Sequence, residues 1–159
     1  MHHELPRRSF LGISAAALAG TALGAKATAP ARSAGVPAVV ASGNGLTAAR
    51  HAYDLLPRGV DPAVAVVKGV AIIEDDPDDM TVGLGGLPNA DGVVQLDASV
   101  MHGPTHKAGA VACLEGVRNP AAVALEVLRR TNHTLLVGEG ARRFALELGF
   151  KEENLLSDR

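Results

Sequence analysis

The sequence has no tryptophan, a single tyrosine, three phenylalanines and one cysteine among its 159 residues. With so few aromatic rings, the core must be filled by valine, leucine, isoleucine and alanine, a composition that suits helices packed closely on a sheet. One cysteine cannot form a disulfide within the chain, which excludes a small fold held together by disulfides. Cys113 stands in the apolar run GAVACLEG, so we expect it to be buried in the core.

The chain also lacks an excess of positive charge. Its 15 Lys and Arg residues are opposed by 17 Asp and Glu residues, for a net charge of -2. This balance provides no basic surface for nucleic acid. The apolar run Phe10–Leu23 is about 14 residues long, fewer than the roughly 20 that span a bilayer. We therefore expect neither nucleic acid nor a membrane among the partners.

The N-terminal segment has the organisation of an export signal. Paired arginines in PRRSFLG precede the apolar run, and Ala25-Lys26-Ala27 supplies the small residues that a signal peptidase requires. Residues 1–29 are predicted to be a twin-arginine signal, which delivers a folded protein to the periplasm or outside the cell. Residues 30–37, rich in Ala, Pro, Ser and Gly, are predicted to be a flexible lead-in. The folded domain is expected over residues 38–159.

Hydrophobic periodicity and helix-capping signals predict an α+β domain with helices covering a sheet. Asp61-Pro62 and Asn119-Pro120 each place a capping residue before a proline, which is typical of a helix start. The predicted strands cover residues 38–42, 93–101, 108–114 and 134–137. The predicted helices are at 46–56, from 61–62 to 73, from 119–120 through 128, and 141–148.

Three motifs that suggest a ligand lack the necessary geometry. The glycines of LGGLPNADG lead into a strand, whereas a phosphate site needs glycines that open a helix. His102 and His106 have the spacing of two zinc ligands on a helix, but Gly103 and Pro104 prevent that helix. The acidic run from Glu74 to Asp79 lacks the alternating ligands of a calcium loop, so we expect it to be a solvated loop. No metal or cofactor is predicted.

No nucleophile in the sequence has a visible base beside it. His133-Thr134 offers a hydroxyl next to an imidazole, and Ser42 follows a predicted strand, where nucleophiles often stand. Neither has a base together with an orienting acid at a recognisable spacing. The residues alone therefore describe a scaffold without catalytic residues of its own.

Four motifs, in order, resemble the α subunit of the glycosylasparaginases, within the asparaginase and isoaspartyl peptidase group of N-terminal nucleophile hydrolases. Together they cover nearly everything after the export signal. The motifs are IIEDDP (72–77), VGLGGLPNADGVVQLDASVM (82–101), AGAVACLEGVRNPAAVA (108–124) and HTLLVGEGARRFALELGF with ENLL (133–156).

The resemblance implies an αββα sandwich, of which this sequence is the N-terminal, α-subunit half. Such a precursor cuts itself, and the new N-terminal Thr of the β subunit is both nucleophile and, through its α-amino group, base. The His-Asp-Thr or His-Gly-Thr cleavage point of the family does not occur in this sequence, so the chain alone is expected to be inactive. The implied partners are the β subunit, a small amide substrate and a second αβ pair.

The resemblance also assigns site residues. Ser42, with Gly43 next to it, matches the loop where the glycosylasparaginase branch carries a substrate-lining Trp, and Thr81 matches a hydroxyl residue beside the nucleophile. Gly83, Gly85 and Gly86 form the structural loop. The family commonly reads MDG where this sequence has Met101-His102-Gly103. The implied activity is therefore hydrolysis of N4-glycosylated asparagine, with an L-asparaginase or β-aspartyl peptidase, or a non-catalytic exported binding module, as alternatives.

Overall fold

The computed structural model describes residues 35–157, so the predicted export signal and most of the lead-in lie outside the described residues. The chain divides into two units, Met1–Val36 and Pro37–Arg159, and the fold is that of the second unit.

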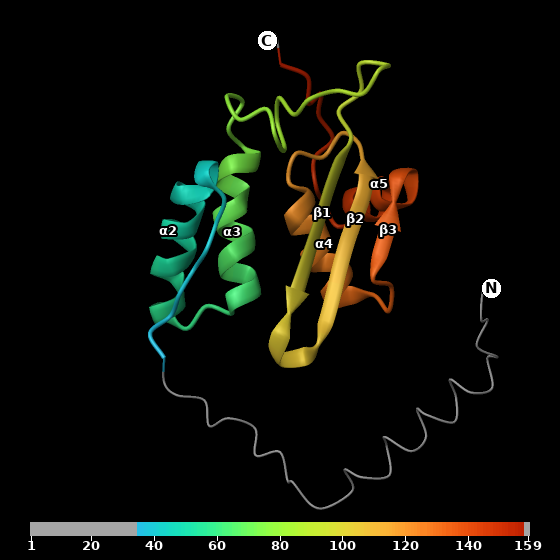
Figure 1. Cartoon of the computed structure of the whole chain (residues 1–159). Helices are drawn as coiled ribbons and strands as arrows, with labels where there is room; N and C mark the ends of the chain where they lie inside the picture. The colour runs from blue at the N-terminus through green and yellow to red at the C-terminus, as the bar shows by residue number, and fades with distance from the viewer. Residues whose placement is uncertain (1–34, 158–159) are drawn as a thin grey trace, which may run out of the picture. The chain divides into compact units, whose positions relative to one another are not determined.

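The second unit has the predicted mixture of helices and strands (Figure 1). All four predicted helices are confirmed, with bounds that move by one to three residues, and three of the four predicted strands are present. In chain order the elements are η1 (Gly43–Gly45), α2 (Leu46–Leu55), η2 (Leu56–Arg58), α3 (Pro62–Glu74), β1 (Leu96–His102), η3 (Gly103–Thr105), β2 (Lys107–Leu114), α4 (Pro120–Arg130), β3 (Leu135–Val137) and α5 (Gly138–Glu147).

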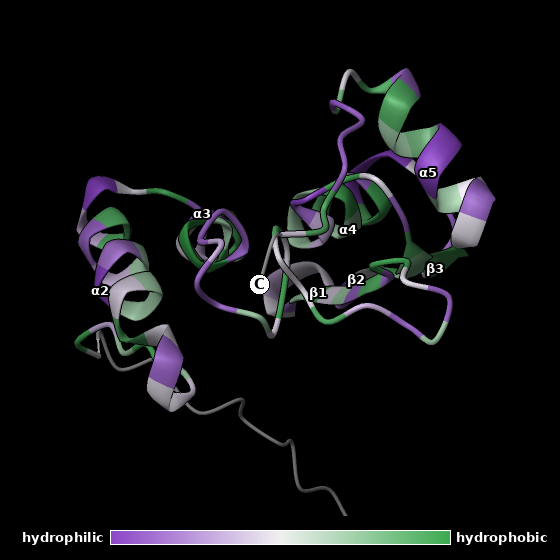
Figure 2. Ribbon diagram, turned by 90° about the horizontal axis from the view of Figure 1, so that it is seen from above, coloured by the Kyte–Doolittle hydropathy of each residue, from purple (hydrophilic) through white to green (hydrophobic). Residues whose placement is uncertain are grey.

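The three strands form one sheet in the order β1-β2-β3. β1 and β2 are an antiparallel hairpin, and β3 adds to β2 in parallel after the crossover through α4. Helices α4 and α5 cover one face of this sheet, and α3 lies between α4 and α2 (Figures 1 and 2). The fold is therefore α+β, as predicted.

The core lies between the sheet and α4 and is built from aliphatic side chains, as the composition predicts. Val100 and Val111 point from the strands toward Val123 and Val127 of α4, and all four are at most 7 % exposed. Gly109 permits this close approach, because a Cβ there would lie 2.3 Å from the carbonyl oxygen of Ala124. In the described chain no buried side-chain polar atom is without a hydrogen-bond partner.

The opposite face of the sheet, called the open face below, is covered by no described element (Figure 2). The strand register places Met101 beside Ala108, and Leu135 beside Ala110. Met101 is 78 % exposed, and Leu135 and Val137 are about half exposed. This face consists of Ser99, Met101, Ala108, Ala110, Ala112, Leu135 and Val137.

The strand predicted at residues 38–42 is wrong. The structure has no strand there, although Ser42 is extended, with φ -62° and ψ 168°. A strand needs a hydrogen-bonded neighbour, and no strand among the described residues pairs with this segment. Val40 is 91 % exposed, so its β-branched side chain lies on the surface.

The prediction that Cys113 is buried is also wrong, since its side chain is exposed. The pairing of β1 with β2 shifts between Leu96 and Ala98, where a bulge occurs. Cys113 occupies the bulge with φ 50°, and its N–H donates to Asp97 Oδ1 at 2.7 Å. The extra residue reverses the inside-outside alternation, so Leu114 points into the core in place of Cys113.

Glu74 connects the end of α3 to the start of α4 and to the glycine-rich loop. The prediction that the whole acidic run is solvated is therefore wrong at this residue. It ends α3 and is 1 % exposed. Its Oε1 accepts a hydrogen bond from the N–H of Ala121 at 3.0 Å, and Asn119 Nδ2 donates to Oε2 at 3.3 Å. Its carbonyl oxygen accepts from Leu84 N–H at 2.8 Å. Asp61 caps α3 as predicted, but Glu74, and not Asn119, supplies the side-chain acceptor at the start of α4.

Glu74 is expected to make stability depend on pH. Burial raises the pKa of its carboxyl group from the ordinary 4.5 to about 7. Between these values the folded chain binds more protons than the unfolded chain, so the contribution of Glu74 is full below pH 4.5 and is lost as the pH rises through about 7. Urea unfolding followed by circular dichroism should show this loss, on the order of 3 kcal/mol.

The Glu74→Gln variant should not show this part of the pH dependence, because an amide does not titrate. Glu147→Gln, at an exposed glutamate at the end of α5, is the matched control and should retain the wild-type profile. Identical pH profiles for wild type and Glu74→Gln would contradict the role assigned to Glu74.

Candidate functional site

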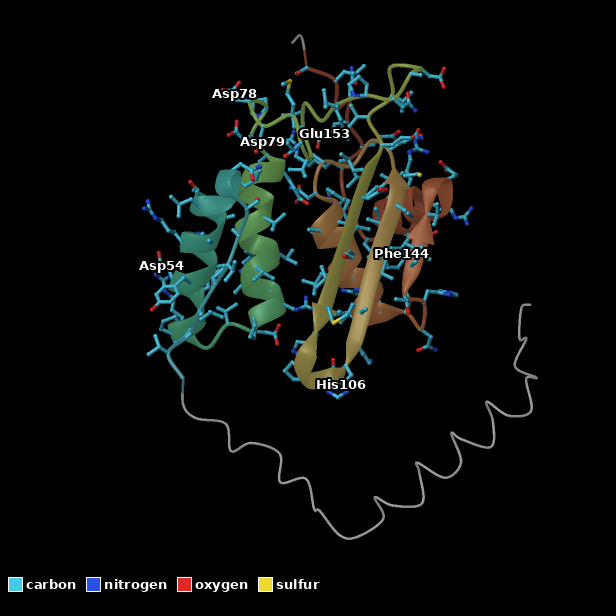
Figure 3. The ribbon with its side chains drawn as sticks, viewed as in Figure 1. Asp54, Asp78, Asp79, His106, Phe144 and Glu153 are labelled. Carbon is cyan, nitrogen blue, oxygen red and sulfur yellow. The ribbon has the colours of Figure 1, made fainter. Side chains whose placement is uncertain are left out.

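Two loops that the sequence separates by almost forty residues meet at one end of the helix pair α2 and α3. Ser42 lies directly before η1 and α2, and Thr81 lies in the loop that follows α3. The two helices run antiparallel, so the start of α2 lies beside the end of α3 (Figure 1). Figure 3 shows Asp79 above this end of α3.

A hydrogen-bond network connects the two loops through Asn44. Ser42 Oγ donates to Asn44 Oδ1 at 2.6 Å, and Asn44 Nδ2 donates to Asp79 Oδ2 at 2.8 Å and to Thr81 Oγ1 at 3.4 Å. Asp79 Oδ1 accepts the backbone N–H of Thr81 at 2.9 Å and also its hydroxyl. The two residues that the resemblance assigned separately, Ser42 and Thr81, therefore belong to one network.

Asp79 is the anionic centre of this network. Hydrogen bonds from the Thr81 side chain, the Asn44 amide and the Thr81 backbone hold the pKa of Asp79 below its ordinary value. An ionised Asp79 accepts a hydrogen bond from the Thr81 hydroxyl, and Asn44 Nδ2 donates to one lone pair of Thr81 Oγ1, so the other lone pair remains to accept a hydrogen bond from another group. The network orients the hydroxyl but does not make it a nucleophile.

A pocket of about 500 Å³ lies next to the network. Ser42, Asn44 and Thr81 line one part of it, and aliphatic side chains such as Val70 and Ile73 line the rest. The residues that line it include no histidine, lysine, aspartate or glutamate, so the lining itself provides no side-chain base for nucleophilic attack. Gly43 is adjacent in sequence but does not line this pocket.

The glycine-rich loop that follows Thr81 is buried. Gly83 and Gly85 have φ of 63° and 80°. A Cβ on Gly83 would lie 2.0 Å from the carbonyl oxygen of Glu74, and Gly86 packs against Val94 and Leu96. The N–H of Gly85 donates to the carbonyl of Leu155 at 2.7 Å. These contacts fix the course of the chain between Thr81 and β1.

Sequence reasoning missed Asn44 and Asp79. Asn44 stood inside SGNG, which indicates a loop whatever its polar side chain does, and Asp79 stood in an acidic run. Pairing between loops that are distant in sequence leaves no local signal. The one available hint was that Asp79 precedes Thr81 by two residues, the spacing of an Asx turn.

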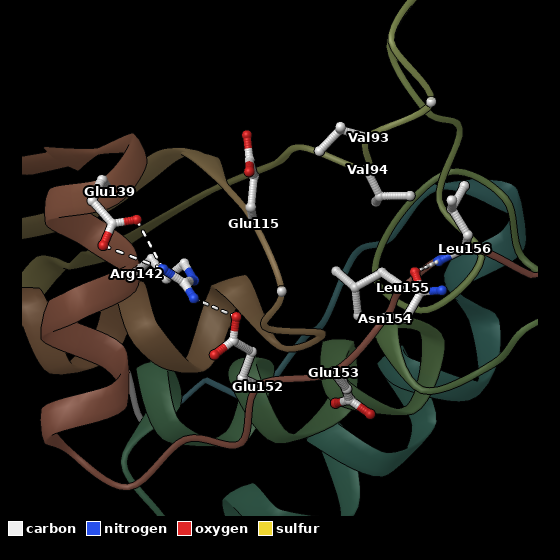
Figure 4. Close-up of a pocket in the computed structure, with 12 residues that line it drawn as sticks. Val93, Val94, Glu115, Glu139, Arg142, Glu152, Glu153, Asn154, Leu155 and Leu156 are labelled. Atoms are coloured by element: carbon white, nitrogen blue, oxygen red, sulfur yellow. Dashed lines mark hydrogen bonds and ion pairs between the residues drawn. The ribbon is translucent and has the colours of Figure 1, made fainter.

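Another pocket, of about 320 Å³, lies near α5 and the C-terminal segment (Figure 4). Its carboxylates are already paired: Arg142 donates to Glu139 at 2.9 Å and to Glu152, and Gln95 Nε2 donates to Glu115 at 2.7 Å. No serine, threonine or cysteine lines it. This arrangement supports the surface structure and offers no reactive group.

The histidine pair does not form a metal site. His102 contacts Asp61 and Thr105, while His106 is exposed at the tip of the hairpin (Figure 3). Within residues 35–157 no group of three or more His, Cys, Asp or Glu side chains is placed to hold a metal ion. None of the helices in this range is long and apolar enough to cross a membrane.

Comparison with known proteins identifies the family of this chain. A family model described as asparaginase matches residues 22–158. The chain therefore belongs to the asparaginase family, and the resemblance stated from the motifs is confirmed.

Two named relatives represent two branches of this family. The chain is 44 % identical over 158 residues to an N(4)-(beta-N-acetylglucosaminyl)-L-asparaginase of Elizabethkingia miricola. The aligned region covers 95 % of the chain and 46 % of that protein. It is 36 % identical over 115 residues to an isoaspartyl peptidase/L-asparaginase of Rattus norvegicus. That aligned region covers 70 % of the chain and 34 % of the rat protein. The chain thus spans about half the length of these relatives or less.

The Asn44–Asp79 contact should be visible as an energetic coupling. Asn44→Ala and Asp79→Ala are each expected to lower the free energy of unfolding by about 1 kcal/mol, because each removes hydrogen bonds between the loops. The double variant should cost at least about 0.5 kcal/mol less than the sum, since the second change removes a contact already lost. Urea unfolding of the four proteins measures this coupling.

A matched cycle of Asn44→Ala with Asp54→Ala, an exposed aspartate of α2, should be additive. If the Asn44–Asp79 cycle were equally additive, the two loops would not be coupled through these side chains.

Proposed function

We propose that the chain is the α portion of an amidohydrolase that cleaves the β-amide of asparagine-type substrates, with N4-glycosylated asparagine as the first candidate. The proposal is based on one observation: Ser42 and Thr81 line the same pocket and are connected by hydrogen bonds through Asn44. The relative from Elizabethkingia miricola, matched over 95 % of the chain, supports this substrate.

The nucleophile in this proposal is a Thr at the N-terminus of a β portion. Its hydroxyl adds to the β-amide carbon, its α-amino group takes the hydroxyl proton and passes it to the leaving amine, and water then hydrolyses the ester. In this proposal, residues 35–157 help to position the nucleophile. Asp79 and Asn44 orient Thr81, whose oxygen can accept a hydrogen bond from the incoming Thr.

A second substrate class is supported by the absence of tryptophan. The glycosylasparaginase branch carries a Trp in the loop that Ser42 matches, and this chain has a small hydroxyl side chain there. Such a loop provides no aromatic surface for a sugar. Free asparagine and β-aspartyl peptides are therefore the alternative substrates, and a relative with such a name, the isoaspartyl peptidase/L-asparaginase, covers 70 % of the chain.

The proposed protein has an αββα architecture in which the β portion supplies a second sheet over the open face. Two features support this arrangement: the exposed apolar residues of the open face, and the extended segment 37–42 without a pairing strand among the described residues. The αβ units would associate in pairs. A twin-arginine signal over residues 1–29 would export the assembled protein to the periplasm or beyond the cell.

The decisive experiment expresses the chain together with the coding sequence that follows Arg159 and assays the processed protein. We expect a Thr after His-Asp or His-Gly, self-cleavage there, and hydrolysis of aspartylglucosamine in preference to asparagine and a β-aspartyl dipeptide. Preference for either of the latter would support the alternative substrates. A stop codon without a partner frame, or inactivity on all three, would instead favour an exported binding module.

The open face should make the isolated chain associate at high concentration, because it leaves apolar sheet surface in water. Met101→Lys and Leu135→Lys together should shift analytical ultracentrifugation profiles toward monomer, whereas Met80→Lys, at an exposed methionine outside the open face, should not. A wild-type chain that stays monomeric and melts cooperatively at all concentrations would contradict the uncovered-face interpretation.

A further inference from the structure

A second cluster of polar side chains lies next to the turn that joins β1 to β2. His102, the last residue of β1, points both ring nitrogens at partners. Its Nε2 lies 3.0 Å from Asp61 Oδ2, and its Nδ1 lies 2.8 Å from Thr105 Oγ1. The cluster therefore connects the start of α3 to the end of β1 and to the turn η3.

The Asp61 carboxylate is fully engaged in this cluster. Its Oδ1 accepts the N–H groups of Ala63 and Val64 at 2.9 and 3.3 Å, and its Oδ2 faces His102. Although burial raises it, the pKa of Asp61 is lowered overall, because the Val64 N–H and the nearby His102 favour the charged form. Both oxygens of Asp61 therefore have partners, and neither forms an ion pair with the nearby Lys107 or Arg129.

Two cations line a pocket of about 270 Å³ beside the cluster. Lys107 forms no ion pair with any described residue. Arg129 contacts Glu126 at 3.5 Å, while the closer partner of Glu126 is Arg130. The pocket is lined by Asp61, Ala63, His102, Thr105, Lys107, Leu125, Leu128 and Arg129.

We propose that this pocket binds a small aliphatic carboxylate. Lys107 and Arg129 supply the charges that hold the carboxylate group, and Thr105 supplies a hydroxyl donor. Ala63, Leu125 and Leu128 provide an apolar wall for a short hydrocarbon chain, which a fully hydrated inorganic phosphate would not use. The site shares no residue with the Ser42–Thr81 network, so a test of carboxylate binding here is independent of a test of the proposed function.

The hydrogen bonds of His102 couple anion binding to a proton. When Nε2–H donates to Asp61 in the neutral ring, Nδ1 is an acceptor and the Thr105 hydroxyl must donate to it. A proton on Nδ1 reverses this bond, and the Thr105 hydroxyl becomes free to donate to the anion. The charged or polar groups around His102 are Asp61, Thr105, Lys107 and Arg129. Carboxylate binding that uses the Thr105 hydroxyl should therefore take up a proton at His102 Nδ1, so the affinity should be greater at lower pH.

The test is titration of the chain with butyrate, acetate and inorganic phosphate, in a zwitterionic buffer at constant ionic strength, followed by isothermal titration calorimetry. Butyrate is expected to bind more tightly than acetate, and phosphate more weakly than both. Phosphate binding as tight as butyrate binding would overturn the assignment of a carboxylate. Absence of saturable binding by all three would overturn the site itself.

Charge-neutral variants locate the site. Lys107→Gln and Arg129→Gln should each weaken butyrate binding about tenfold, the loss of one charge-assisted hydrogen bond. The matched controls are Lys68→Gln on the exposed side of α3 and Arg143→Gln at an exposed arginine of α5, neither of which lines the pocket. Equal affinity in all four variants would show that butyrate binds elsewhere.

The proton coupling has its own readout. His102→Gln should abolish the proton uptake that accompanies butyrate binding, because the ring nitrogen that receives the proton is removed. Thr105→Val should reduce the pH dependence without removing the histidine, and Thr105→Ser should restore it. A wild-type pH profile in Thr105→Val would overturn the relay through the hydroxyl, even if His102→Gln failed to fold.

Discussion

The buried carboxylate of Glu74 is the interaction on which the arrangement of this chain depends. It is the last residue of α3, and its side chain accepts the N–H of Ala121 in the first turn of α4. A carboxylate at this position satisfies a free backbone donor and interacts favourably with the positive end of the helix. It does so at a cost, since burial raises its pKa to about 7. This polar contact joins the end of α3 to the start of α4, in addition to the apolar packing of Ala63 and Val67 in the core that α4 shares.

The same residue determines where the candidate site lies. The carbonyl of Glu74 accepts the N–H of Leu84, so the nine residues between them must close into a loop over the end of α3. Gly83 permits this closure because any Cβ there would overlap that carbonyl. The closed loop brings Asp79 and Thr81 back toward the start of α2, within reach of Asn44. The pocket is thus a consequence of a helix terminus and one glycine, and not of the polar residues that line it.

The sequence predicts those features that local forces determine. Asp61-Pro62 predicts the start of α3 correctly, because the capping bond is formed within four residues. Segment 38–42 has the composition of a strand, but pairing depends on a neighbour that lies far away in sequence or outside the described residues. Cys113 follows an apolar pattern that a single bulge reverses. The partnership of Asn44 with Asp79 connects positions 35 residues apart, which neither periodicity nor composition reports.

The buried polar side chains in the described part of the chain have hydrogen-bond partners, whereas part of its apolar sheet surface is exposed to water. This difference indicates how a second portion would bind. Within the described residues every buried side-chain polar atom has a partner, including Glu74. What remains exposed includes apolar sheet surface, with Met101 at 78 %, and the backbone of residues 37–42, which pairs with no described strand. Under the proposed function, a β portion would therefore bind through apolar burial and strand pairing, not through ion pairs. Such an interface depends weakly on salt but strongly on register, because a shift of one residue would expose every inward side chain. Correct placement of the nucleophile beside Thr81 would then follow from strand register, with the Asn44–Asp79 network as the local adjustment.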